Sequence, residues 1–115
     1  MEEKTINICG KEVRVAYCAA VEISFEILSD KSINDIDFSR QQDIMKLSMA
    51  ALTVPYERDR QPCPVSSREL MYEASPKELI ALFTTMIALR QEWYGVSAAV
   101  PDVKPSGTEA DPKNA

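Results

Sequence analysis

Two glutamates four positions apart, Glu22 and Glu26, form the closest approach in this chain to an acid–base or cation-binding pair. On one face of a helix, two carboxylates can bind a hard cation or act as paired acids. Neither a glycine-bearing loop nor a further cluster of ligand residues accompanies them in the sequence. We therefore expect both side chains to be solvated, and the pair predicts neither catalysis nor a metal site.

The complete absence of histidine excludes the commonest general base and the commonest zinc ligand. The three cysteines, Cys9, Cys18 and Cys63, are an odd number without a CxxC spacing, so we expect reduced structural thiols. Cys63 lies between two prolines, and we expect it to be the most accessible thiol. The three glycines are too far apart for a phosphate-binding loop. The sequence therefore predicts a protein without a cofactor, and not an enzyme.

Length and charge narrow the class of protein further. A chain of 115 residues with 45% hydrophobic and 27% charged residues fits one domain. The net charge of −5 and the scattered basic residues argue against a nucleic-acid partner. The sequence contains no apolar stretch near the roughly 20 residues of a membrane span, and its N-terminus lacks the pattern of a secretory signal. We expect a soluble, cytoplasmic protein that does not enter a membrane.

The elements that position these residues begin with a predicted β-hairpin. Residues 4–9 and 12–16 alternate apolar and polar side chains on both sides of Gly10-Lys11. A two-residue loop there pairs Ile8 with Val13 and Ile6 with Val15, and places these β-branched residues on one face. A two-stranded hairpin is marginal alone, so this face must pack on helices.

Four helical segments follow. The first spans residues 17–29, with Ile23 and Ile27 widening its apolar face. A capping box at Ser39-Arg40-Gln41-Gln42 predicts a second helix that ends at Pro55. A short helix capped by Ser66 or Ser67 is expected to run through Tyr72, and Ser75-Pro76-Lys77-Glu78 opens a last helix that stops at Gly95. The predicted fold is α+β, mainly α, with the hairpin packed on a small bundle of three to four helices in residues 1–95, and residues 96–115 as a disordered, flexible tail.

The last helix has an apolar face broader than one packing partner needs. The face has two interpretations: the helix is the centre of a bundle, or part of it meets another chain. For the second case, the candidate partner-binding residues are Phe83, Met86, Arg90, Trp93 and Tyr94. We expect the charged head of Arg90 to reach solvent, although it can also stack on an aromatic ring.

Four methionines form a second candidate surface. Met45, Met49, Met71 and Met86 fall on predicted helices, and methionine adapts to irregular partners. Because methionine at helical spacing is more often part of a core, we favour a core position for them.

The order of these parts resembles the small tail assembly chaperones of long-tailed phages and prophages. In that family a hairpin turn similar to NGKEV precedes a helix rich in Leu and Glu, and Ile8-Cys9-Gly10-Lys11-Glu12-Val13 and residues 17–28 occupy those places. The resemblance covers the layout of residues 4–95. The chain has Asp30-Lys31 where many members close the first helix with glycine.

The resemblance implies a non-enzymatic role in the cytoplasm of the host cell. The chain would bind the tape measure protein, keep it soluble, and help tail tube proteins to assemble around it. The alternative is a small homodimeric adaptor or antitoxin-like regulatory protein, in which the broad face of the last helix meets a second copy of the chain.

Overall fold

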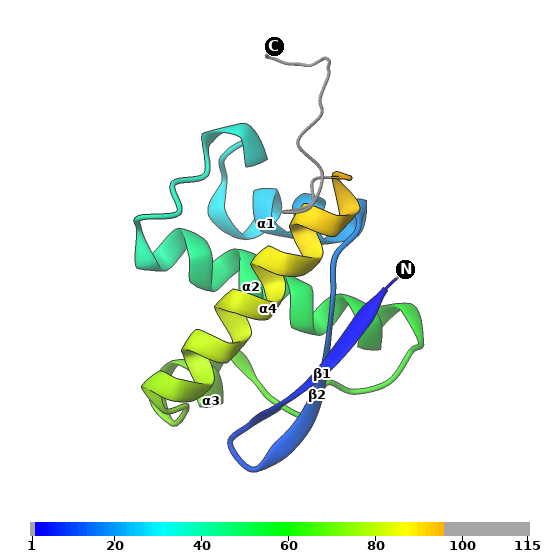
Figure 1. Ribbon diagram of the computed structural model, residues 1–115, viewed down its shortest axis with the longest axis vertical. Coiled ribbons are helices and arrows are strands. Elements are labelled where there is room, and N and C mark those ends of the chain that lie inside the picture. Colours follow the sequence, from blue (N-terminus) through cyan, green and yellow to red (C-terminus); the bar gives the residue numbers. More distant parts are fainter. Residues whose placement is uncertain (1, 96–115) are drawn as a thin grey trace.

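The computed structural model describes residues 2–95, which form an N-terminal hairpin and four α-helices (Figure 1). This arrangement confirms the predicted mainly α fold. The predicted flexible tail, residues 96–115, lies outside the described residues. In chain order the elements are β1 (Glu3–Ile8), β2 (Lys11–Ala16), α1 (Ala19–Ser29), the short 3₁₀ helix η1 (Ile33–Asp35), α2 (Gln41–Arg58), α3 (Ser67–Tyr72) and α4 (Pro76–Trp93).

The hairpin turn lies one residue earlier than predicted. Ile8 pairs with Lys11 and Ile6 pairs with Val13, so the predicted register is wrong. Cys9 and Gly10 form the loop, with φ angles of 53° and 75°, as a type I′ turn requires of both loop residues. The pairing differs from the predicted one by two residues, an even number that keeps every side chain on its expected face.

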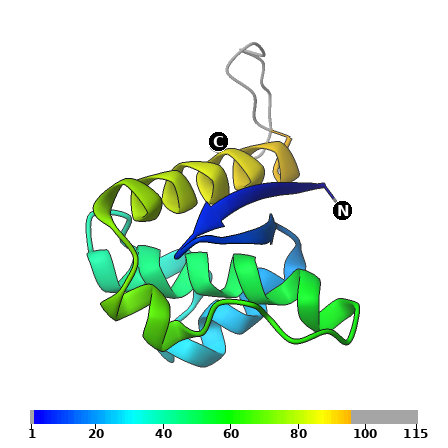
Figure 2. The same ribbon diagram turned by 90° about the horizontal axis from the view of Figure 1, so that it is seen from below.

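The hairpin lies between α4 and α2, and α1 packs on the far side of α2 (Figure 2). This layering buries the β-branched face that a free hairpin would leave in water. The core joins the hairpin to all four α-helices, and its largest fully buried side chains include Ile8, Val13, Val15, Phe25, Leu47, Leu52, Leu70, Leu82 and Met86.

The inward face of α1 is narrower than predicted. Val21 and Phe25 are fully buried, whereas Ile23, Ile27 and Leu28 are exposed. The expectation that Ile23 and Ile27 widen the buried stripe is therefore wrong. Because α1 is the outermost layer, only one side of it meets α2, and its remaining apolar side chains stay on the surface.

Both ends of α2 differ from the prediction. Ser39 does not cap the helix, because its hydroxyl donates to Asp37 Oδ1 at 2.6 Å and Arg40 occupies the N-cap without a side-chain bond. Pro55 lies inside the helix, which continues to Arg58. Proline has no N–H to donate, but its carbonyl still accepts a bond from Asp59 N. The buried Tyr56 holds this last turn, because its hydroxyl accepts the backbone N–H of Arg14 at 2.9 Å.

The starts of α3 and α4 are confirmed. Ser66 with Glu69 and Ser75 with Glu78 form complete capping boxes, and Pro76 opens α4. Gly95 follows α4 with a φ of 78°, as expected of a residue beyond a helix C-terminus. Within residues 2–95, no helix combines the length and the apolar character needed to cross a lipid bilayer.

Candidate binding surfaces

The structure separates the five residues predicted to bind a partner. Met86 is fully buried in the core and presents no surface. Phe83 is half-buried and lines a depression beside Ile44 of α2. Arg90, Trp93 and Tyr94 come together at the end of α4, where Trp93 is 44% and Tyr94 48% exposed.

Glu22 organises this end of α4. Its Oε2 accepts hydrogen bonds from the hydroxyl groups of Tyr17, at 2.7 Å, and Tyr94. Arg90 Nε donates to the Tyr17 hydroxyl at 3.2 Å and lies 3.9 Å from Glu22 Oε2. Burial and the bond to Glu22 raise the pKa of Tyr94 to about 12. The expectation that Glu22 is solvated is wrong, since its carboxylate ties α1 to α4.

Glu26 has a different partner, so the two glutamates do not act as a pair. Its Oε2 accepts the backbone N–H of Ile33 at 2.8 Å, which holds η1 beside α1. Glu22 thus connects α1 to the end of α4 and Glu26 connects α1 to η1, so the expectation that Glu26 is solvated is also wrong. In the described part of the chain, no cluster of three or more His, Cys, Asp or Glu side chains has the geometry to hold a metal ion.

Aromatic rings complete the cluster at the end of α4. The Arg90 guanidinium stacks 4.7 Å from the ring centroid of Tyr94 and 5.2 Å from that of Phe38. The Trp93 centroid lies 5.6 Å from that of Tyr17 and 4.9 Å from that of Tyr94. Arg90 thus stacks on rings instead of extending its head into solvent. The contacts of Arg90 and Tyr94 with Glu22 connect the end of α4 to α1.

A second surface follows α2 on another side of the molecule. One row of α2 residues, spaced by four, lines two adjoining cavities of about 590 Å³ and 520 Å³. The cavities share Leu28 and Met49, so together they form one groove. At 1.5 Å per residue the row is about 24 Å long. Its members are Gln41, Met45, Met49, Thr53 and Glu57; we call this surface the α2 groove.

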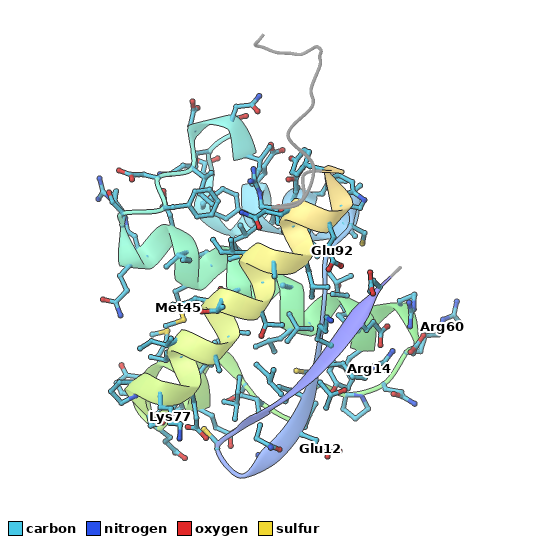
Figure 3. The ribbon with its side chains drawn as sticks, viewed as in Figure 1. Glu12, Arg14, Met45, Arg60, Lys77 and Glu92 are labelled. Carbon is cyan, nitrogen blue, oxygen red and sulfur yellow. The ribbon has the colours of Figure 1, made fainter. Side chains whose placement is uncertain are left out.

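The walls of the α2 groove come from three other helices and the segment before α3. Ile27 and Leu28 of α1 form one wall, and Val65 and Met71 with Leu79 of α4 form the other. Ile27 is 77% exposed and Met71 57% exposed. In Figure 3, Met45 lies on α2 to the left of α4, away from Glu92 near the last turn of α4. The α2 groove and the cluster at the end of α4 are therefore separate surfaces.

The sequence interpretation missed this surface because it favoured a core position for the four methionines. A core position is correct for Met86 and wrong for Met71, while Met45 and Met49 are half-buried in the floor of the groove. The signal available in the sequence was the four-residue spacing of Met45 and Met49, which places both on one face of a helix. Helical periodicity shows which side chains share a face, but it does not show whether another element covers that face.

The cysteines add no reactive group to either surface. All three are free and half-buried. The Cys63 thiol is 3.2 Å from the carbonyl oxygen of Val65, and burial raises its pKa above the ordinary value. Cys63 is half-buried like the other two cysteines and does not stand out as an exposed thiol, because it contacts Leu52 of α2 at the edge of the groove.

The α2 groove can hold an apolar, elongated ligand, and it contains neither a nucleophile with an adjacent base nor a pair of carboxylates. Comparison of the chain with protein-family models, curated proteins and solved structures found no match.

Proposed function

We propose that this chain is a non-enzymatic assembly chaperone that binds apolar helical segments of a longer protein in the α2 groove. The α2 groove carries this proposal. It follows a row of α2 residues about 24 Å long, with methionines in its floor and apolar walls on both sides. A groove of this kind suits the apolar face of an amphipathic helix. The flexible methionine side chains can adapt to different sequences, as a helper of a long partner must.

The resemblance to tail assembly chaperones supplies the proposed partner. A tape measure protein made before its tube would expose many helical apolar stripes in the cytoplasm. A small protein that covers these stripes one at a time would keep the long chain soluble until tail tube proteins surround it. The chain's net charge of −5 supports this role, since like charges on successive bound copies favour solubility.

The energetics require only weak individual sites. Apolar burial contributes about 25 cal/mol per Å², and loss of translational freedom and side-chain ordering offset much of it. Micromolar binding at each segment is sufficient when a long partner offers many segments.

The homodimeric adaptor or antitoxin-like protein remains the second candidate function. It is favoured by Ile80, Trp93 and Tyr94, which are exposed on α4. Against it, Tyr94 and Trp93 already contact Glu22 and Tyr17 within the same chain. A self-association surface there would have to form around side chains that are partly engaged.

Coexpression with the tape measure protein of a long-tailed phage tests the proposal. The variants are Ile27→Asp and Met71→Asp, which place a charge on exposed side chains of the groove walls. Ile80→Asp is the matched control, because Ile80 is 64% exposed and lies outside the groove. Wild type and the control should raise the soluble fraction of the partner and copurify with it, whereas the two groove variants should do neither.

The proposal would be overturned if wild type and the three variants had the same effect on the solubility and copurification of the tape measure protein. If none of them binds the tape measure protein, the chaperone function is wrong. If all of them bind it, the α2 groove is not the binding surface. Sedimentation of the same proteins tests the alternative, because a homodimer through α4 should be weakened by Ile80→Asp and left intact by Met71→Asp.

A further inference from the structure

The two cavities of the α2 groove carry opposite charges on α2. Lys46 lines the cavity near the start of α2, and Glu57 lines the cavity near its end. They lie 11 positions apart in the sequence, or about 16 Å along the helix axis. Met49, which lines both cavities, lies between them along α2.

These two charges have no ion-pair partner among residues 2–95. Their charged neighbours on α2 do have partners. Asp43 pairs with Lys31 at 2.7 Å, and Arg58 pairs with Glu3 and Asp59 at 2.8 and 2.9 Å. The charges left over on α2 beside the groove are thus one cation in one cavity and one anion in the other.

We infer that the segment bound in the α2 groove is an amphipathic helix with an acidic and a basic side chain flanking its apolar stripe. The acidic side chain meets Lys46 and the basic one meets Glu57. Their separation in the partner is about three helical turns, which matches the distance of about 16 Å along α2 between Lys46 and Glu57. This inference rests on the proposed function and adds the charge pattern of the partner segment to it.

The charge pattern acts mainly as a filter on which segments bind. Ion pairs at the rim of a groove contribute little affinity, because water and salt screen them. Like charges at both ends of a segment would bring one repulsive pair for each attractive one. A segment with opposite charges avoids this cost, and it can enter the groove in the one direction that pairs both ends.

Three synthetic peptides of about 16 residues test the inference. All share one leucine stripe at helical spacing and differ only at two flanking positions, which are acidic and basic, both basic, or both acidic. The protein variants are Lys46→Glu, Glu57→Lys and the double exchange. Fluorescence anisotropy of labelled peptides at physiological salt gives the dissociation constants.

Wild type should bind the mixed peptide about threefold more tightly than either of the others, the size expected for one surface ion pair. Lys46→Glu should change the preference to the doubly basic peptide, and Glu57→Lys to the doubly acidic peptide. The double exchange should restore the preference for the mixed peptide, which then binds in the opposite direction.

The outcomes separate this inference from the proposed function. Equal binding of all three peptides that is lost in Met71→Asp would overturn the charge pattern and leave the groove as the binding site. A preference for the doubly basic peptide in every variant would show attraction to the net negative charge alone, and would also overturn it. Binding that Met71→Asp leaves unchanged would overturn the α2 groove itself.

Discussion

The backbone amide of Cys9 donates a hydrogen bond of 2.9 Å to Oε2 of Glu78. The other oxygen of the same carboxylate accepts the backbone N–H of Ser75 at 2.9 Å and so completes the capping box of α4. These amide donors, with Ser75 first, lower the pKa of Glu78. One side chain therefore fixes both the start of α4 and the position of the hairpin turn.

The positive φ of Gly10 in the hairpin turn predicts that a substitution there lowers stability through backbone strain. Gly10 has a φ of 75°, and a methyl group added there would meet no atom within 4 Å. Gly10→Ala should therefore lower the free energy of unfolding by about 1 kcal/mol through strain alone. Urea unfolding measures the change. Cys9→Asn is the control, because asparagine tolerates the left-handed region, and it should cost less than Gly10→Ala. Equal stability of Gly10→Ala and wild type would contradict the turn.

Neighbouring strand residues test which face of the hairpin is buried. Ile8 is completely buried, whereas Asn7 beside it is exposed. Ile8→Lys places an unpaired charge in the core and should cost about 3 kcal/mol or more. Asn7→Lys should change the unfolding midpoint little, because its side chain stays in water. The reverse order of the two effects would show that the strand faces are exchanged.

The buried carboxylate of Asp43 predicts a loss of stability in acid. Its Oδ2 lies 2.7 Å from Lys31 Nζ and accepts the backbone N–H of Asp37 at 3.0 Å. These contacts lower the pKa of Asp43, the bond to Lys31 most. The stabilisation is therefore complete above the unfolded-state pKa of about 3.9, and is lost as the pH falls through the lower folded-state pKa.

Asp43→Asn isolates this contribution. The variant keeps the shape of the side chain but cannot carry the charge. Its melting temperature should lie several degrees below that of wild type at pH 7, and the difference should shrink toward pH 2. Calorimetry at a series of pH values measures both. A difference that is constant with pH would show that the ion pair with Lys31 does not stabilise the fold.

The Tyr94 hydroxyl predicts the opposite dependence in alkali. Its pKa is raised to about 12, above the ordinary value of about 10. The stabilisation is therefore complete below pH 10 and is lost as the pH rises through about 12. The fluorescence of Trp93, the single tryptophan, reports detachment of the end of α4. Tyr94→Phe keeps the ring without a titrating group, so its alkaline change in fluorescence should be smaller. Equal changes in both proteins would contradict the bond to Glu22.

Local signals were sufficient where a structure is built from neighbouring residues. The capping box of Ser75 needs residues only three apart and was predicted correctly, and Ser66 is one of the two caps that the sequence offered for α3. The hairpin was predicted because alternation marks its strands, but its turn was misplaced by one residue. Cys9 adopts a positive φ that its residue type does not favour, and the long-range bond to Glu78 supports a turn that local preference does not show.

The binding surfaces depended on contacts that sequence spacing does not contain. Glu22 looked solvated because its partner Tyr94 lies 72 positions away. Pro55 looked like a helix end because the anchoring bond between Tyr56 and Arg14 spans 42 positions. Met45 and Met49 looked like core because nothing in the sequence shows that α2 is left uncovered along that row. Each of these differences comes from tertiary packing that overrides a local preference.

The position of the hairpin between α2 and α4 also sets the order in which the protein can mature on the ribosome. The strands are synthesised first, but Glu78, which closes the turn, follows Cys9 by 69 positions. At about 5–20 residues per second, the nascent hairpin waits several seconds for the helix that covers its second side. The apolar face of the hairpin thus remains exposed until most of the domain has been translated. A chain proposed to shield other nascent apolar segments passes through the same exposed state itself.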